Sequence, residues 1–276
     1  MKYKLNKPSL ELSGIVKEYI IIDDFNRIKD MYCLPDGGNF LFFNRGLKAY
    51  ASLSTGERFE IPEHFSISIK NGKSKKIIID KSFKIDDKML PVILVELTPT
   101  GFYKLFNKNS SVLNNFYMPI DSNINEKYFN KLYEHNNIPD MINYLDKGLV
   151  DLKSHNKNSD FLLVEEVILS IKYKHNCEVS IEELILEFNI SRKTLERQFK
   201  KIVGYTPKNY IFILKFYKSC LEYIQGKKTL KDIEYLYTDN SHFNVVFKNI
   251  TGFTPRQLLK DIKNNNVQIY QMKRDL

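Results

Sequence analysis

Two short segments in the C-terminal part of the chain share one pattern of glycine, aromatic residue, threonine and proline. They are Gly204-Tyr205-Thr206-Pro207 and Gly252-Phe253-Thr254-Pro255, and their glycines lie 48 residues apart. Glycine ends helices readily because it adopts left-handed backbone angles without strain, and proline is well tolerated in the first turn of a helix. The repeated pattern therefore predicts two helical units of similar construction, each followed at once by another helix.

The residues before the first of these segments have the spacing of a helix-turn-helix. Ser180, followed three residues later by Glu183, predicts a capping box at the start of a short helix. Phe188-Asn189-Ile190 forms the expected turn, and Ser191 begins a second helix that we expect to reach residue 203. The side chains expected to close between these two helices are Leu184, Ile190, Leu195 and Phe199.

The second helix of this unit, over residues 191–203, keeps one polar face open. The residues on that face are Arg192, Lys193, Glu196, Arg197 and Lys200. Side chains of these types, in the first turns of a helix, suit the phosphates and base edges of a DNA major groove. The second unit repeats the plan, with Leu230, Ile233 and Leu236 on one helix and residues 240–248 on the next.

The positive charge of the chain is concentrated in its C-terminal part. The formal net charge is +9, yet residues 1–170 hold 23 basic and 22 acidic side chains, whereas residues 171–276 hold 19 and 11. Residues 191–220 contain eight Lys or Arg and one acid, Glu196. This density favours a polyanionic partner such as nucleic acid or a membrane surface; the alternative is a solvated lysine-rich surface.

The N-terminal part has the pattern of an antiparallel β-structure, a barrel or a sandwich. The runs that predict strands are 14–23, 39–43, 65–69, 75–80 and 92–97. Asn71-Gly72-Lys73 predicts a hairpin between the third and fourth of these runs. After Pro119 apolar residues recur at threes and fours, which indicates amphipathic helices. The leucine stripe of the helix expected over 128–152 fits either a dimer surface or a cover for the barrel, and we favour the dimer.

The stretch from about 175 to 262 resembles the DNA-binding domain of the AraC/XylS family of transcriptional regulators, in which a long helix joins two helix-turn-helix units. The most specific residues are Ser241-His242-Phe243, Phe247-Lys248 and Gly252-Phe253-Thr254-Pro255. The resemblance implies that the second helix of each unit enters one of two successive major-groove faces of double-stranded DNA, about 34 Å apart. RNA polymerase is implied as a further partner where such a regulator is an activator.

The same resemblance assigns roles to individual residues. Lys193, Glu196 and Arg197 are implied as base readers, with Arg192, Thr194 and Lys200 near phosphates. The matching residues of the second unit are Asn240, Ser241, His242, Asn244, Val245 and Lys248. Its turn is two residues shorter than the family pattern, and Val245 stands where Arg is common. We therefore expect the first unit to supply most base discrimination and the second to position the duplex backbone.

The N-terminal part carries a second resemblance, in Leu34–Asn44 and Val95–Phe102, to the cupin-like domain of a subgroup of these regulators. It implies effector sensing or dimer contacts, and the barrel interior would hold either a small molecule or its own side chains. The predicted fold is thus α+β with two domains. Residues 1–155 would be an antiparallel, cupin-like β-barrel with trailing helices, and residues 160–276 an all-α tandem helix-turn-helix domain, joined by the polar stretch 153–159.

Nothing in the sequence assembles an active site, so we expect no enzyme activity, no cofactor and no metal. His64 is the one histidine of the expected barrel, too few for a metal-dependent cupin. Three separated cysteines and no run of about 18 apolar residues predict a cytoplasmic protein without a membrane span. The alternatives are a cytosolic cupin-type enzyme or ligand-binding protein with a basic helical appendage, and a nonspecific nucleic-acid-binding protein.

Overall fold

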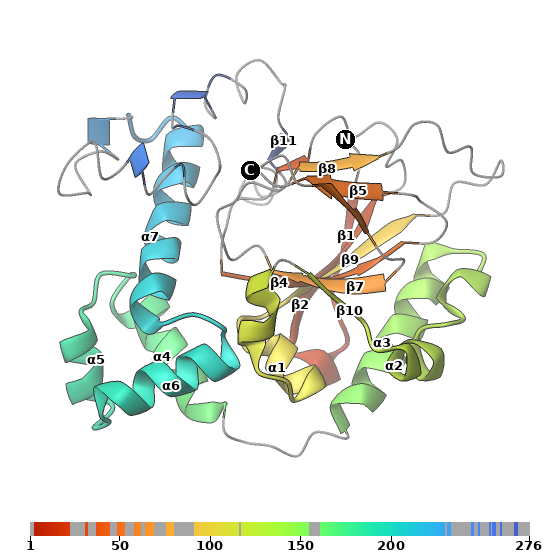
Figure 1. Ribbon diagram of the computed structural model, residues 1–276, viewed down its shortest axis with the longest axis horizontal. Coiled ribbons are helices and arrows are strands. Elements are labelled where there is room, and N and C mark those ends of the chain that lie inside the picture. Colours follow the sequence, from red (N-terminus) through yellow and green to blue (C-terminus); the bar gives the residue numbers. More distant parts are fainter. Residues whose placement is uncertain are drawn as a thin grey trace.

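The computed structural model describes part of the chain in detail. The described residues are 3–22, 31–32, 37–44, 49–52, 58–61, 64–68, 76–79, 91–115, 117–154, 161–229, 231–232, 244–245, 248, 254, 256–257, 260 and 268–269. Antiparallel sheets with helices make up the N-terminal part, and helices make up most of the C-terminal part (Figure 1). The predicted α+β fold class is confirmed.

The larger sheet has six strands and entirely antiparallel pairing. Its spatial order is β1 (Tyr3–Asn6), β2 (Val16–Ile22), β9 (Val92–Leu97), β4 (Asn39–Phe43), β7 (His64–Ser68) and β10 (Tyr117–Pro119). A three-stranded antiparallel sheet has the order β6 (Arg58–Ile61), β5 (Ala49–Ser52) and β8 (Lys76–Ile79). Strand β3 (Met31–Tyr32) pairs in parallel with β11 (Gln268–Ile269), so a segment near the C-terminus joins the N-terminal part of the chain.

The hairpin predicted between β7 and β8 is wrong. Strand β7 lies between β4 and β10 in the larger sheet, and β8 pairs with β5 in the smaller one. Residues 71–73, which carry the turn pattern, are outside the described residues. A turn pattern indicates where the chain reverses, whereas the choice of partner strand depends on which faces are buried, and the sequence pattern of two short β-branched runs does not contain that information.

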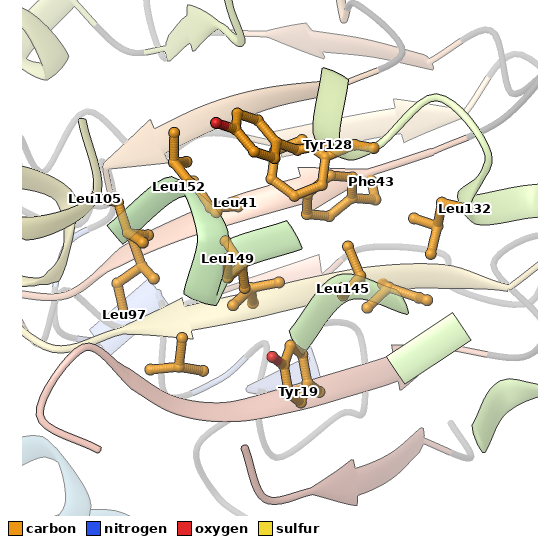
Figure 2. Close-up of a cluster of buried hydrophobic side chains, with 14 of the residues drawn as sticks. Tyr19, Leu41, Phe43, Leu97, Leu105, Tyr128, Leu132, Leu145, Leu149 and Leu152 are labelled. Carbon is orange, nitrogen blue, oxygen red and sulfur yellow. The ribbon is translucent and has the colours of Figure 1, made fainter. Parts of the chain in front are cut away.

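One face of the larger sheet is covered by the helices that follow it. These elements are α1 (Gly101–Phe106), η3 (Ser110–Asn115), α2 (Ser122–Tyr128), η4 (Leu132–Glu134) and α3 (Ile138–Ser154), with the short turn η1 (Leu10–Leu12) beside them. Figure 2 shows Leu145, Leu149 and Leu152 of α3 directed at Leu41 and Phe43 of the sheet. The stripe that we assigned to a dimer surface is therefore buried within the chain. An apolar stripe shows that a helix face is covered, but does not identify its cover.

The C-terminal helices enclose a separate core. They are α4 (Leu162–Leu169), the π-helical turn η5 (Ser170–Lys174), α5 (Ile181–Glu187), α6 (Arg192–Ile202) and α7 (Pro207–Ile224). Helix α7 is the predicted joining helix, and two of its aromatic residues, Tyr210 and Phe216, are completely buried. Both rings therefore lie in the core and not on a surface that could stack with bases.

The two parts meet through α1, η3 and the turn before β4. Tyr103 of α1 is buried in the core of the C-terminal helices, although it lies far before residue 160. Lys104 forms an ion pair with Glu165 of α4, and the Thr100 hydroxyl donates to the same carboxylate at 2.8 Å. Gly37 has φ +79°, and a Cβ there would lie 2.9 Å from the Tyr210 ring, so only glycine fits at this contact.

Candidate nucleic-acid interface

The first helix of the N-terminal helix-turn-helix unit, α5, begins with the predicted capping box. The Glu183 amide donates to Ser180 Oγ at 3.2 Å, and the Ser180 amide donates to Glu183 Oε2 at 2.7 Å. The Ser180 amide, followed by the Ser180 hydroxyl, which donates to the same Glu183 Oε2 at 2.8 Å, holds the pKa of Glu183 below its usual range. Two otherwise unpaired amides at the helix start are thereby satisfied.

The turn between α5 and α6 closes by backbone hydrogen bonds. Asn189 takes left-handed angles, with φ 47°, and its amide donates to Leu186 O at 3.3 Å. The Ile190 amide reaches back to Ile185 O at 3.2 Å. This pair of bonds is a Schellman motif, which ends α5 sharply and redirects the chain. Asparagine is one of the few residues other than glycine that adopts these angles at small cost.

Helix α6 begins immediately after the turn and has one buried side. Ser191 is its N-cap, with Oγ accepting from the Thr194 amide at 3.1 Å. Leu195 and Phe199 are buried, and the Phe199 ring lies 5.8 Å from that of Tyr210 on α7. The four core residues expected between the helices meet as predicted: Leu184, Leu195 and Phe199 are buried and Ile190 is partly buried against them.

The opposite side of α6 is open and cationic. Five of the six residues predicted here are exposed, namely Arg192, Lys193, Glu196, Arg197 and Lys200, while Thr194 is half-buried beside the cap. The Arg192 guanidinium forms an ion pair with Glu182 in the first turn of α5. The Arg192 side chain is therefore directed toward the start of α5. The structure thus brings all the predicted residues of the first unit onto the first three turns of one helix.

Both glycine-threonine segments carry a threonine that caps a helix start, although Gly252 and Pro255 of the second segment lie outside the described residues. Gly204, with φ 86°, follows the end of α6, and Thr206 Oγ1 accepts from the Asn209 amide at 3.3 Å at the start of α7. In the second segment Thr254 Oγ1 accepts from the Gln257 amide at the same distance, 3.3 Å. The two predicted helix starts therefore share one capping geometry.

The second unit is described only at scattered positions. Thr229 and Asp232 form a reciprocal cap, with bonds of 2.7 and 3.3 Å, at the expected start of its first helix. Asn244, Val245 and Lys248 are helical and exposed. Asn240, Ser241 and His242 lie outside the described residues. The proposed roles of all six residues therefore stay predictions.

A polar cluster that the sequence did not reveal holds the end of α5. Glu187 accepts from Ser170 Oγ at 2.8 Å, and its carboxylate lies 2.8 Å from His175 Nε2 and 3.0 Å from Lys174 Nζ. The hydrogen bond with His175, followed by those from Ser170 and Lys174, lowers the pKa of Glu187 to about 2. Ser170 and Lys174 belong to the π-helical turn and His175 follows it directly; such turns are rare, and the helical period of apolar residues does not predict them.

The described residues contain no group of His, Cys, Asp and Glu side chains suited to hold a metal ion. Among the helices in the same described ranges, none is long and apolar enough to cross a membrane.

Comparison with known proteins gives one family model and a set of relatives that match only part of the chain, and solved structures that align with most of it. Residues 184–261 match the model of a helix-turn-helix domain family. The transcriptional activator RhaS of Mannheimia succiniciproducens is 32% identical over 83 residues, which are 29% of this chain and 31% of the relative. RhaS of Escherichia coli O139:H28 is 29% identical over 83 residues, 30% of its length. The match thus spans about a third of each relative.

Among solved structures, ToxT from Vibrio cholerae in its P21 crystal form has a TM-score of 0.42 and 12% identity, covering 92% of this chain and 97% of that one. A second ToxT structure, with unsaturated fatty acid bound, has a TM-score of 0.42 and 15% identity, covering 92% and 95%.

Proposed function

We propose that this chain, which has an AraC-type helix-turn-helix domain at residues 184–261, is a sequence-specific DNA-binding regulator of transcription. The observation that carries the proposal is the two-sided construction of α6. One side is buried in the core, and the other presents Lys193, Glu196 and Arg197 to solvent. The major groove of B-DNA is about 12 Å wide and admits a helix presenting such a face.

The residue types on this face suit distinct contacts. Arg197 and Lys193 are donors for the O6 and N7 acceptors of guanine, and Glu196 accepts from the amino group of cytosine. Arg192, Thr194 and Lys200 flank these three and are proposed to hold phosphates, Arg192 after exchanging its ion pair with Glu182 for one with the backbone. In this arrangement the phosphate contacts fix the position of α6 along the duplex, and the base contacts then distinguish one sequence from another.

For the whole protein we extend the proposal as follows. The second unit, through Asn240, Ser241, His242, Asn244, Val245 and Lys248, grips the next turn of the duplex and mainly positions its backbone. Regulation is by activation, as in the relatives named RhaS, and involves RNA polymerase. The N-terminal sheets sense a small-molecule effector or form a homodimer, and the protein acts in the cytoplasm without enzyme activity.

The test uses the full chain and a pool of random duplexes from which bound sequences are selected. The affinities for the selected duplex and for a shuffled duplex are then measured over a range of salt concentrations. We expect Arg197→Ala to reduce the preference for the selected sequence by about 1 to 3 kcal/mol, while binding to the shuffled duplex weakens only mildly.

The matched control is Lys208→Ala, which removes an exposed cation on α7 outside the α6 face. This control should keep the preference. If the unaltered chain selects no sequence but still binds duplexes with a steep salt dependence, the nonspecific-binding alternative holds. Absence of any duplex binding favours the ligand-binding alternative.

A further inference from the structure

The reading helix α6 is held at its C-terminal end by a residue from the N-terminal part of the chain. Ser110, the first residue of η3, is completely buried, and its hydroxyl donates to the carbonyl oxygen of Ile202 at 2.6 Å. Ile202 is the last residue of α6. The last carbonyls of a helix lack partners within the helix, and a buried carbonyl without one is costly. Ser110 supplies that partner from 92 residues away in sequence.

The turn that carries Ser110 is itself fixed to the N-terminal core. Leu113, three residues on, is buried in the hydrophobic cluster beneath the larger sheet. The start of η3 is closed locally, since Asn109 Oδ1 accepts from the Ser111 amide at 3.0 Å and Asn109 O accepts from the Val112 amide at 3.1 Å. A movement of α6 relative to the sheet would therefore have to break or stretch the Ser110 hydrogen bond.

A second contact holds the same end of α6. Lys201 Nζ lies 5.3 Å from the centre of the Tyr103 ring, and Tyr103 is buried among Phe199, Ile202 and their neighbours. In Figure 1 this end of α6 lies next to α1, which carries Tyr103. Helix α6 is thus fixed at its start by α5 and the Ser191 cap, and at its end by the N-terminal part of the chain.

We propose that Ser110 is a positioning residue for DNA reading: by holding the end of α6 against the N-terminal core, it sets the angle at which Lys193, Glu196 and Arg197 meet the base edges. This inference rests on the proposed function. Bidentate contacts to base edges are highly sensitive to geometry, whereas nonspecific phosphate binding tolerates reorientation. Loss of the hydrogen bond should therefore reduce discrimination more than it reduces nonspecific affinity.

The experiment compares full-length variants on two probes, the duplex selected from the random pool by the unaltered chain and its shuffled counterpart. Ser110→Ala is expected to reduce the ratio of the two affinities by about three- to tenfold, with affinity for the shuffled duplex within about twofold of the original. Ser110→Thr, which keeps a hydroxyl, should restore most of the ratio. Ser111→Ala is the matched control, because Ser111 bonds to Asn109 through its backbone amide, which the substitution keeps.

Amide hydrogen exchange without DNA tests the structural step separately. Ser110→Ala should raise the exchange of the amides at 199–204 by about tenfold, while Ser111→Ala leaves it unchanged. The inference is overturned if Ser110→Ala keeps the affinity ratio, or if it weakens both probes equally and Ser110→Thr fails to restore the ratio. Failure of the proposed function gives a different result, namely no sequence selected by the unaltered chain.

Discussion

Helices α5 and α6 are built by the same local chemistry but carry opposite charge. Each begins at a serine whose hydroxyl accepts from an amide three residues later, at 3.2 Å from Glu183 in α5 and 3.1 Å from Thr194 in α6. Helix α5 holds Glu182, Glu183 and Glu187, whereas the exposed side of α6 is mainly Lys and Arg. The helix caps and the backbone therefore do not distinguish α5 from α6, the helix proposed to read DNA; the exposed side chains do.

The largest expected effect is on stability, and it comes from the buried core that lies between α5 and α6. Phe199→Ala removes a completely buried ring from the core between α5, α6 and α7 and should lower the free energy of unfolding by about 3 to 5 kcal/mol. Urea unfolding of the full chain measures this loss. Leu186→Ala is the control, since Leu186 on α5 is 80% exposed and its loss should change stability by less than about 0.5 kcal/mol. Equal losses would show that α6 is not held by its buried side.

Loss of either serine cap should lower stability by the same amount, but only one of the two losses should weaken binding to DNA. Ser180→Ala and Ser191→Ala should each cost about 1 kcal/mol of stability, because each leaves an amide at a helix start without its partner. Only Ser191→Ala loosens the turn that carries Arg192 and Lys193, so it alone should weaken duplex binding by folded protein. Equal weakening by both variants would mean that α5 also takes part in contact with DNA.

The smallest expected effect is on how the stability of the protein depends on pH, through Glu187 at the end of α5. The pKa of Glu187 is lowered to about 2 by its contacts with His175, Ser170 and Lys174. A carboxylate with a lowered pKa in the folded state stabilises the protein above the pKa of the unfolded chain, about 4.3, and this contribution fades as the pH falls toward 2. The stability difference between the unaltered chain and Glu187→Gln, followed by urea unfolding, should shrink steadily as the pH falls below about 4. A difference independent of pH would argue against the ionised cluster.

The features that the sequence predicts correctly are those formed by residues close together along the chain. The capping box at Ser180, the turn at Asn189, the N-cap at Ser191 and the proline restart at Pro207 are all local patterns, and all are found in the structure. The side chains of α6 divide into buried and exposed sets as its helical period predicts.

Contacts between segments far apart along the chain could not be predicted from such local patterns. The partners of β7 are β4 and β10 rather than β8, the stripe on α3 covers the sheet, and Tyr103 completes a core that begins at residue 164. Ser110 carries no pattern that would link it to Ile202. Pairing across many residues depends on complementary shape and burial, and one sequence without its fold does not record these.

The contacts between the two parts of the chain have a consequence for cleavage of the backbone. Strand β11 pairs with β3, Lys104 forms an ion pair with Glu165, and Ser110 donates a hydrogen bond to Ile202. All three contacts are non-covalent and would persist if the backbone were cut between α3 and α4. A single cut between residues 154 and 161 would therefore yield two fragments that remain associated as a nicked but intact particle. Separately produced fragments should assemble in the same way, and their assembly would restore the fixed orientation of α6.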